Sequence, residues 1–364
     1  MKVNYTNLKV KKKNQKKYIK IFSEVLSDGE YVGGKYINLF EKNIANYCGS
    51  KYAVALNSGT DALTLALFAC GVKKGDEIIT IPNSFIASVA AIVHIGAKPI
   101  FVDVLNDQNI DPKRIEKKIT KKTKVIMPVH LTGRVSRMDE IMKIANKHGI
   151  KVIEDAAQSI GAKYKNKLAG TFGKVGCFSA HPLKNLASIG DSGYLITNDK
   201  KIYNKIKLLR NHGIENRNLV KHFGYVSRLD NLKAAVLNYR LKNLNIIIKK
   251  RRKIAKFYFK NINNKKLILP YENQKEFNTY HTFVIQVKNN ERNKLQKYLQ
   301  KNKIETKIHY PIPIHLQPAA KRFNYKKGDF VNTEKQCRSI LSIPVNEQLR
   351  SVDIKKICYY LNKF

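Results

Sequence analysis

The chain has 364 residues, of which 43% are hydrophobic, and a formal net charge of +42 at pH 7. Its length and hydrophobic content are those of a globular protein with one large domain and a smaller one. The longest near-uniform apolar run, Ile86–Val93, is far shorter than the roughly 18 residues of a membrane span, which excludes an integral membrane protein. The basic N-terminus has neither the apolar core of a signal peptide nor the Arg and Ser of a mitochondrial presequence, so we expect a cytoplasmic protein.

The cysteines and the charge exclude further classes of site. The five cysteines are scattered, odd in number and in no ligand spacing, which predicts reduced, mostly buried thiols and no metal site. A strongly basic chain attracts anions, but lysine greatly exceeds arginine and its runs are not interleaved with aromatic residues. We therefore interpret the charge as compositional drift, expect no specific nucleic acid as a partner, and keep nucleic-acid binding as a remote alternative.

In chain order, residues 1–28 have helical periodicity, and a second amphipathic helix follows Gly33-Gly34. From Tyr52 onward, short apolar segments alternate with helical ones, which indicates an α/β fold with a mostly parallel central sheet. The predicted strands are Tyr52–Leu56, Glu77–Ile81, Lys98–Val102, Lys124–Pro128 and Lys151–Ile153. The predicted helices among them are Ala62–Cys70, Phe85–Ile95 and Met138–His148.

The C-terminal part has a different pattern. Helices are predicted at Tyr203–Arg210, Leu229–Leu244 and Ile248–Phe259. After them, the strand Tyr280–Val287 and the helices Asn293–Lys301 and Val352–Leu361 indicate an α+β unit. We therefore predict a large domain over residues 1–244, including the N-terminal helical segment, and a small C-terminal α+β domain over residues 245–364.

A polar loop between two predicted strands contains one lysine of interest. Cys177 and Phe178 lead into this loop, and Gly190-Asp191-Ser192-Gly193 closes it into the strand Tyr194–Thr197. Lys184 lies at its centre. Because most lysines are solvated surface residues, Lys184 becomes a candidate only together with other parts of a site.

Two further motifs follow predicted strands, at the sheet edge where open α/β folds build their sites. Ser58-Gly59-Thr60 opens a helix, where free backbone N–H groups and hydroxyls suit a phosphate, although an ordinary helix cap has the same sequence. Glu154-Asp155 ends another strand, and because adjacent strand residues point to opposite faces, only one of these acids faces a given ligand. A buried carboxylate at this position requires a cationic partner.

One cofactor, pyridoxal phosphate, uses all of these parts. It needs a lysine amine for its aldehyde, an acid for its ring nitrogen, donors for its phosphate and an apolar face for its ring. The candidates for these four roles are Lys184, Asp155, the Ser58–Thr60 turn with Ser179, and Phe85.

With these motifs, the sequence resembles the DegT/DnrJ/EryC1/StrS family of sugar aminotransferases, which has the aspartate-aminotransferase-like fold of fold type I pyridoxal-phosphate enzymes. The resemblance runs from about Gly29 to the C-terminus. It is carried by NSGTDAL (57–63), EDAAQSIGA (154–162), FSAHPLKNL (178–186), GDSG (190–193), GYVSRLDNLKAA (224–235) and HYPIPIHLQP (309–318). Several separate motifs in one order make this match specific.

The resemblance implies a role for each matching residue. Lys184 forms the internal aldimine and moves the proton during amino transfer, and Asp155 pairs with the pyridinium nitrogen. The remaining cofactor contacts are Gln158 and Phe85 at the ring, and Gly59, Thr60 and Ser179 at the phosphate.

One position departs from the family pattern. Val226 stands where the family usually has an Asn that reaches the cofactor phosphate of the neighbouring subunit. That contact must be absent or replaced, so we expect weaker cofactor binding. A homodimer with shared active sites is still implied.

The resemblance also implies the substrates, namely a keto sugar linked to a nucleoside diphosphate and L-glutamate as amino donor, in amino sugar and polysaccharide biosynthesis. The segment SRLD (227–230), together with HYPIPIHLQP, is more similar to the branch that acts on 3-keto sugars than to the 4-keto branch. Candidate substrate contacts are Arg228, His309, Tyr310 and His315, with a structural hydrogen-bonded role as the alternative for each histidine. Two alternative functions keep the cofactor, an aminotransferase that acts on a cyclitol and a non-catalytic regulator.

Overall fold

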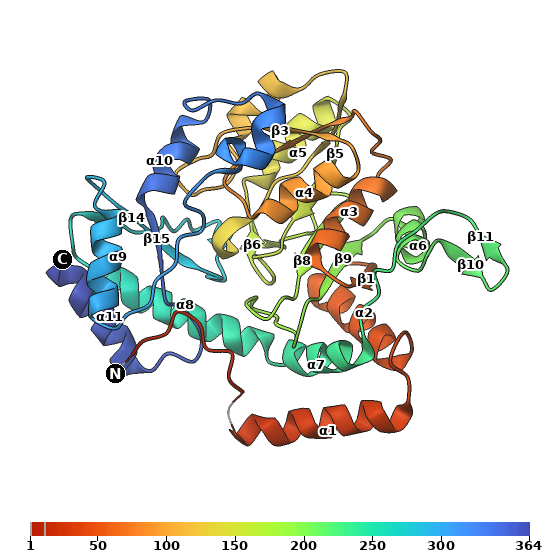
Figure 1. Cartoon of the computed structure of the whole chain (residues 1–364), viewed down its shortest axis with the longest axis horizontal. Helices are drawn as coiled ribbons and strands as arrows, with labels where there is room; N and C mark the ends of the chain where they lie inside the picture. Colours follow the sequence, from red (N-terminus) through yellow and green to blue (C-terminus); the bar gives the residue numbers. More distant parts are fainter. Residues whose placement is uncertain (1, 11) are drawn as a thin grey trace.

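The computed structural model describes residues 2–10 and 12–364, and a seven-stranded sheet lies at its centre (Figure 1). The strands are β1 (Tyr52–Leu56), β2 (Glu77–Thr80), β3 (Lys98–Phe101), β4 (Thr123–Ile126), β5 (Lys151–Asp155), β8 (Val175–Ser179) and β9 (Gly193–Thr197). Their order in the sheet is β1-β9-β8-β5-β4-β2-β3. Strand β9 is antiparallel to both of its neighbours, whereas the other paired strands are parallel. The predicted α/β fold with a mostly parallel sheet is confirmed.

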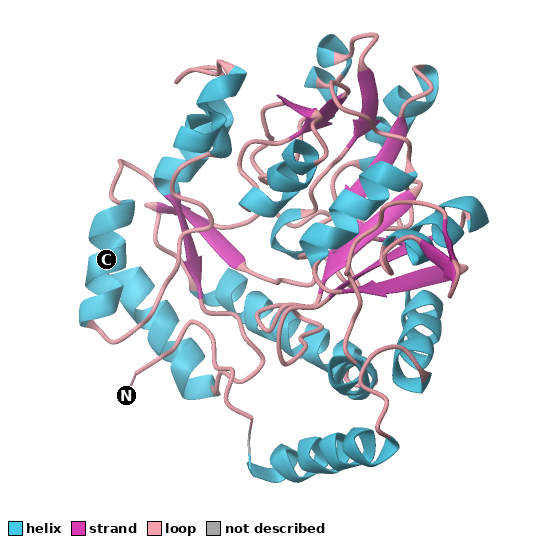
Figure 2. Ribbon diagram, turned by 45° about the vertical axis from the view of Figure 1, so that its right-hand side comes forward, coloured by secondary structure: helices cyan, strands magenta, loops and turns pink. Residues whose placement is uncertain are grey.

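Helices cover both faces of this sheet, as Figure 2 shows. Successive strand residues point to opposite faces, so Ala53 packs in one apolar cluster and its neighbour Val54 in the other. The cluster of Ala53 includes residues of α2 (Lys35–Cys48), α5 (Met138–Lys147) and α7 (Asn231–Leu241). The cluster of Val54 includes residues of α3 (Gly59–Ala69), α4 (Ile86–His94) and α6 (Lys200–Leu209). This three-layer packing brings the carboxyl ends of the parallel strands to one edge.

The ends of these helices follow local sequence signals. Gly49 stands directly after α2 with a φ of 67°, a conformation that glycine adopts without strain. Asp199 caps α6, because its side chain accepts the amides of Lys201 and Ile202. Such signals determine where these helices begin and end, although α6 begins three residues before its predicted start at Tyr203.

A smaller unit packs beside the large sheet. Its antiparallel sheet consists of β12 (Leu267–Ile268), β14 (Phe283–Val287) and β15 (Ile340–Ile343), and the accompanying helices are α8 (Leu244–Asn261), α9 (Arg292–Lys301) and α11 (Ser351–Lys363). Helix α8 connects the two cores, since Ile248 packs in the large one and Tyr258 in the small one. Val3, near the N-terminus, also packs in the small core. We therefore propose that the domain boundary lies inside α8 and that residues 2–7 accompany the small domain.

Several local predictions differ from the observed elements. Within the segment 1–28, which was predicted to be helical, the helix is α1 (Lys12–Asp28), and residues 2–10 are not helical. The predicted helix Leu229–Leu244 is interrupted between α7 and α8. The strand predicted from Tyr280 begins at Phe283, because Tyr280 has a φ of 48°, which no β-strand adopts. Helix α10 (Val331–Ser339) was not predicted, because its polar sequence has no apolar stripe. A distant carboxylate, that of Asp103, accepts the backbone amides at the start of this helix.

The remaining elements are short or peripheral. Helix α1 (Lys12–Asp28) packs on α7, and the hairpin of β10 (Ile214–Asn216) and β11 (Leu219–Val220) projects from the body of the molecule (Figure 1). A third small sheet contains β6 (Lys163–Tyr164), β7 (Lys167–Leu168) and β13 (Glu276–Phe277). The 3₁₀ helices are η1 (Pro112–Arg114), η2 (Glu116–Lys118), η3 (Leu131–Gly133), η4 (Ile314–Leu316) and η5 (Pro318–Phe323).

Two observations concern the whole described chain. All five cysteines are buried, as free thiols. Within residues 2–10 and 12–364, no helix combines the length and the apolar character that crossing a membrane requires.

Candidate active site

The loops that follow β1, β5 and β8 border a cavity of about 460 Å³. On one side the large domain contributes what we call the sheet wall, which consists of Gly59, Thr60, Asp155, Gln158, Ser179 and Lys184. On the other side the small domain and the N-terminal segment contribute the small-domain wall, which consists of Tyr5, Arg251, His281, His309, Tyr310 and Asn346. The cavity therefore lies between the two domains, at the carboxyl edge of the parallel strands.

The turn between β1 and α3 approaches β8 closely. Ser58 caps the helix, because its Oγ accepts the amide of Asp61 at 3.0 Å. A Cβ atom on Gly59 would lie only 2.8 Å from the Cβ of Ser179, so only glycine permits this approach. The first amides of a helix have no partner within the helix and carry partial positive charge. Together with the hydroxyls of Thr60 and Ser179, they suit a phosphate group.

Glu154, the first of the two adjacent acids, points away from the cavity and is fully buried. Its carboxylate accepts backbone amides at 2.6–2.7 Å and lies 2.9 Å from the Nε2 of His130. The amide donors are Gly170, Phe172 and Gly173. These contacts hold the following loop against β5, so Glu154 has a structural role.

Asp155, the second acid, lines the cavity and is also buried. Its carboxylate accepts a hydrogen bond from Ser88 Oγ at 2.7 Å and from the amide of Ala157 at 3.1 Å. Among the described residues it forms no ion pair with a basic side chain within 4.0 Å. A buried carboxylate without such a partner favours a cationic group in the cavity, and the prediction that the two acids separate in this way is confirmed.

Lys184 lies in the loop between β8 and β9, whose shape is set by short backbone bonds. The amide of Lys184 donates to the carbonyl of His181 at 2.8 Å, and the amide of Ser188 donates to that of Ala180 at 2.8 Å. Burial lowers the pKa of the Lys184 amine to about 8, and the negative charge of Asp155 opposes this shift. Lys184 is therefore far more often a neutral amine at neutral pH than a surface lysine is.

Gln158 and Phe85 also line the cavity. The Oε1 of Gln158 accepts the amide of Thr132 at 2.8 Å, which fixes its side chain. Phe85 is 54% exposed, although it lines the cavity, and its ring lies 5.8 Å from that of Tyr310. An apolar ring this exposed at the cavity has a free face for a ligand.

These residues fit pyridoxal phosphate. The buried Asp155 requires a cation, which a protonated pyridine nitrogen supplies, and Lys184 provides an amine with a lowered pKa. The glycine at position 59 leaves the start of α3 open to a phosphate beside Ser179. All the residues that the sequence analysis predicted to bind the cofactor therefore line one cavity.

The small-domain wall contains residues that the sequence motifs did not reveal. Tyr5 comes from the N-terminal segment, which forms backbone contacts with the small domain. Its amide donates to Glu305 Oε2 at 3.0 Å, its carbonyl accepts from Asn346 Nδ2 at 3.0 Å, and its ring lies 5.7 Å from that of His309. No local pattern signals these contacts, because the partners lie about 300 residues apart in the chain.

The histidines of the small-domain wall are neutral. Burial lowers the pKa of His309 to about 4, and that of His281 lies well below its usual value for the same reason. The positive charge of Lys184 lowers both pKa values further. His309 Nδ1 lies 2.9 Å from Ser342 Oγ, so this ring is held in place. At neutral pH these rings offer hydrogen bonds rather than positive charge.

The four predicted substrate contacts lie in different places. His309 and Tyr310 line the cavity. His315 is buried outside it, 3.2 Å from Glu334 Oε1, and Arg228 borders a separate pocket, where its guanidinium donates to Asn211 Oδ1 at 3.2 Å. Within one chain the fold therefore brings only two of the four to the catalytic cavity, and the substrate role of the others stays a prediction.

Val226 lies near the projecting hairpin and is exposed. It pairs with Asn211 in an isolated antiparallel bridge. Leu219, Val220 and Phe223 of the same region are also exposed, Phe223 fully. None of these four residues is among those that line the catalytic cavity, and the hairpin that contains Leu219 and Val220 projects from the body of the molecule (Figure 1).

The chain is similar to known proteins over nearly its whole length. A profile of the "DegT/DnrJ/EryC1/StrS aminotransferase family" matches residues 12–362. The "dTDP-3-amino-3,6-dideoxy-alpha-D-galactopyranose transaminase" of Aneurinibacillus thermoaerophilus is 38% identical over 96% of each chain. The "Pleiotropic regulatory protein" of Geobacillus stearothermophilus is 36% identical over 95% of each chain. A crystal structure of "S. venezuelae DesV in complex with ketimine intermediate" has a TM-score of 0.96 and 32% identity, and the match covers 100% of this chain and 98% of that chain.

Proposed function

Because this chain belongs to the DegT/DnrJ/EryC1/StrS aminotransferase family, we propose that it transfers the amino group of L-glutamate to a 3-keto sugar linked to a nucleoside diphosphate. The enzyme is an aminotransferase that depends on pyridoxal phosphate. The observation that carries the proposal is the cavity in which Lys184, Asp155 and the start of α3 come together.

The sheet wall performs the steps common to both halves of the reaction. Bound pyridoxal phosphate supplies an aldehyde that condenses with amines and a ring that withdraws electrons from the adjacent carbon. Lys184 holds the cofactor through its amine and, once released, carries the proton between the two reacting carbons. Asp155 keeps the ring nitrogen protonated, because the buried carboxylate and the cation stabilise each other.

The phosphate and the ring are held by the other residues of this wall. Gly59 and Thr60 at the helix start, with Ser179, bind the phosphate by amide and hydroxyl donors. Phe85 would pack on one side of the bound ring, and Gln158, whose side chain is fixed by the amide of Thr132, would lie near the ring hydroxyl. Positioning of this kind orients the reacting carbon toward Lys184.

The small-domain wall binds the amino donor and the keto sugar. His309, neutral and held by Ser342, offers one ring nitrogen to a sugar hydroxyl, and Tyr310 offers its hydroxyl. Tyr5 closes the wall behind His309. A neutral hydrogen-bonding surface suits the hydroxyls of a sugar, whereas the ammonium form of Lys184 would be repelled by charged imidazoles.

Two observations support a 3-keto sugar as the acceptor. The segments SRLD (227–230) and HYPIPIHLQP (309–318) are more similar to those of the 3-keto branch. The relative from Aneurinibacillus thermoaerophilus is named for a dTDP-linked 3-amino sugar.

The exposed apolar residues around the hairpin support a homodimer. Leu219, Val220, Phe223 and Val226 form an apolar surface that a second copy of the chain would cover. Arg228 borders a separate pocket outside the cavity of its own chain, and in such a dimer it would contact the site of the partner. Light scattering of the purified protein, with Phe223→Asp as the disrupting variant, tests this arrangement.

The test of the function separates the two half-reactions. The enzyme with pyridoxal phosphate is mixed with L-glutamate alone, and conversion to the pyridoxamine form is followed by absorbance. The pyridoxamine form is then mixed with dTDP-, UDP- and GDP-linked 3-keto and 4-keto sugars, and the products are identified by mass. Amination of a 3-keto sugar is expected, whereas amination of 4-keto sugars alone would refute the acceptor assignment.

A regulatory function is the second candidate, because one relative of 36% identity is named a pleiotropic regulatory protein. The first half-reaction discriminates between them. A regulator that merely binds the cofactor would show the absorbance of bound pyridoxal phosphate and no conversion with L-glutamate. A cyclitol acceptor would instead leave the glutamate half-reaction intact and give no product with any nucleotide sugar.

A further inference from the structure

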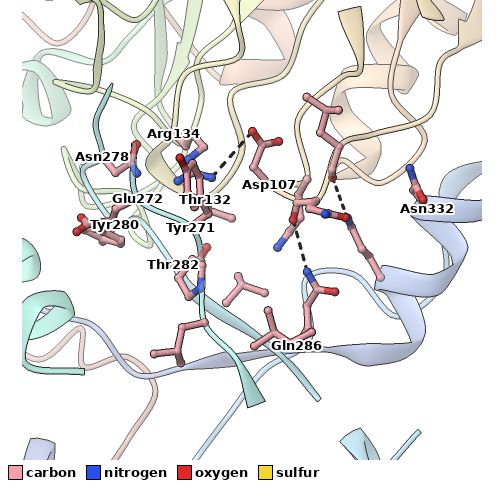
Figure 3. Close-up of a pocket in the computed structure, with 18 of the residues that line it drawn as sticks. Asp107, Thr132, Arg134, Tyr271, Glu272, Asn278, Tyr280, Thr282, Gln286 and Asn332 are labelled. Atoms are coloured by element: carbon pink, nitrogen blue, oxygen red, sulfur yellow. Dashed lines mark hydrogen bonds and ion pairs between the residues drawn. The ribbon is translucent and has the colours of Figure 1, made fainter. Parts of the chain in front are cut away.

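Figure 3 shows a second and larger cavity, of about 840 Å³, which lies between the domains. It adjoins the catalytic cavity, because Thr282 lines both. The large domain contributes the loop 105–108 and residues around Thr132 and Arg134. The C-terminal part contributes the end of α8, the segment 268–286 and one side of α10. The function proposed above uses none of these side chains, although the volume is within the range of small-molecule sites.

The two cavities share a thin wall. Tyr280 lines the second cavity, His281 lines the catalytic cavity, and Thr282 lines both. On the facing loop, Thr132 lines the second cavity, and its amide donates to Gln158, which lines the catalytic one. The two loops are joined, because the amide of Thr282 donates to the carbonyl of Thr132 at 3.4 Å. The backbone of this wall therefore joins residues of the second cavity to residues of the catalytic one.

Buried polar groups without partners gather in the wall of the second cavity. Four lining residues are each at least 94% buried and carry one side-chain atom without a hydrogen bond among the described residues. These atoms are Arg134 Nη2, Asn278 Oδ1, Thr282 Oγ1 and Gln336 Oε1. Leaving such groups unpaired is unfavourable, so each favours a ligand or a bridging water with which it can bond.

The orientation of the amides presents acceptors to this cavity. Gln336 donates through Nε2 to the carbonyl of Leu105 at 2.8 Å, and Asn332 donates through Nδ2 to that of Val104 at 3.0 Å. Gln286 donates through Nε2 to the carbonyl of Asn106 at 3.4 Å. Each NH₂ group is therefore used by the loop, and each amide oxygen remains as an acceptor for a hydroxyl.

Acidic and basic side chains both lie around the second cavity. Arg134 Nε lies 2.9 Å from Glu276 Oε2, and its Nη1 lies 4.0 Å from Asp107 Oδ2, the contact that Figure 3 marks. Burial raises the pKa of the Asp107 and Glu276 carboxyls, because their negative charges are poorly solvated. A further anion nearby would make these charges still less favourable. Arg137 and Lys335 at the same cavity disfavour a cation. This balance of charge disfavours ligands of high net charge.

We propose that the second cavity binds a neutral, hydroxyl-rich molecule of sugar size, and that binding alters the cofactor site through the shared wall. Hydroxyl groups both donate and accept, so one such ligand pairs with the amide oxygens and with the guanidinium of Arg134. Tyr271, which is 69% exposed at the cavity, offers an aromatic face to the C–H groups of a sugar ring. Among the described residues, Thr282 is the one that this cavity shares with the catalytic cavity.

The test uses the enzyme loaded with pyridoxal phosphate and three neutral probes, D-galactose, N-acetyl-D-glucosamine and myo-inositol. Saturation-transfer NMR measures binding, and the absorbance of the bound cofactor is recorded in the same titrations. At least one probe is expected to bind saturably and to shift the cofactor absorbance over the same concentration range. The double variant Tyr271→Ala/Gln286→Ala should weaken this binding about tenfold, while Gln300→Ala, an exposed glutamine on α9, should leave it unchanged.

Other outcomes contradict the proposal. Binding that Tyr310→Ala abolishes and the double variant leaves intact would place the sugar in the catalytic cavity. Tighter binding of inorganic phosphate or L-glutamate that depends on Tyr271 and Gln286 would refute the neutral class of ligand. Binding without any change in cofactor absorbance would refute the coupling, and no saturable binding by any probe would refute the site. None of these outcomes requires transamination activity, so they are independent of the function proposed above.

Discussion

The two walls of the catalytic cavity are built in different ways. The sheet wall consists of short motifs, each directly after a strand of one sheet, and its residues belong to elements that the sequence predicts. The small-domain wall joins an N-terminal residue, Tyr5, to His309 and Asn346 through contacts across about 300 residues of chain. We infer that the first wall handles the cofactor, which every turnover needs, and that the second selects the substrate. Changes in the sheet wall should then impair both half-reactions, whereas a change in the other wall should impair mainly the half-reaction whose substrate the changed residue contacts.

The largest effect is expected for Lys184→Ala. Without the amine, both the attachment of the cofactor and the proton transfer are lost, so both half-reactions should slow by at least about 10³-fold. Stopped-flow absorbance with L-glutamate and then with the keto sugar measures them separately. Lys174→Ala, an exposed lysine one residue before β8, is the matched control and should keep full activity. Full activity of the Lys184 variant would refute the assignment of the site.

Asp155→Asn should reduce the rates of both half-reactions by about 10²-fold, because the neutral amide no longer stabilises a protonated ring nitrogen.

The neighbouring acid, Glu154, should affect stability rather than activity. Glu154→Gln weakens hydrogen bonds to three backbone amides and should lower the free energy of unfolding by about 2 kcal/mol, while the folded protein remains active. Thermal denaturation and single-turnover rates measured on both variants check this division. A stable Glu154 variant without activity would contradict it.

The pKa of Lys184 predicts a pH dependence for cofactor uptake. Burial lowers this pKa to about 8 from its usual 10.5, and only the neutral amine attacks the aldehyde. The rate at which the apoprotein binds pyridoxal phosphate should therefore rise about tenfold per pH unit up to about pH 8 and then level off. Asp155→Asn removes the charge that opposes the shift, so its midpoint should lie lower. A rate that continues to rise toward pH 10 would show that Lys184 is not desolvated.

Tyr5→Ala should affect the two half-reactions unequally. Loss of the Tyr5 ring removes a side chain that packs near the His309 ring. Because His309 is proposed to contact the keto sugar, kcat/KM for this sugar should fall about tenfold, while the rate with L-glutamate should change by less than about twofold. Tyr5→Phe keeps the ring and should behave nearly as the wild type. Equal losses in both half-reactions would show that the small-domain wall does not discriminate between the substrates.

The smallest effect is expected for Val226→Asn. If a partner subunit lies over this exposed position, the amide restores a phosphate donor that the family usually has, and the affinity for pyridoxal phosphate should rise a few-fold. Equilibrium titration of the apoprotein measures the change. Val226→Leu is the control and should leave the affinity unchanged. An unchanged affinity in both variants would indicate that another residue makes this contact.

The residues of the sheet wall could be predicted from the amino-acid sequence alone. The signals are local: Ser58 and Gly59 stand at a strand-to-helix junction, Asp155 ends an apolar strand, and Lys184 lies between two strands. The order of the parallel strands then brings these positions to one edge, because carboxyl ends of parallel strands meet there. The predicted and observed bounds of β1 are identical, and those of β2 to β4 differ by at most two residues at either end.

The second cavity and most of the small-domain wall depend on tertiary packing, although the sequence predicted His309 and Tyr310 of this wall. Tyr5 and His281 stand in no motif, and they reach the site because the N-terminal segment and the segment before β14 pack between domains. Helix α10 is held by Asp103 rather than by an apolar stripe of its own. Arg228 and His315 stand in family motifs, yet they lie outside the cavity of their own chain. Local patterns record the bonding within an element, whereas a contact between distant elements depends on how the whole chain packs.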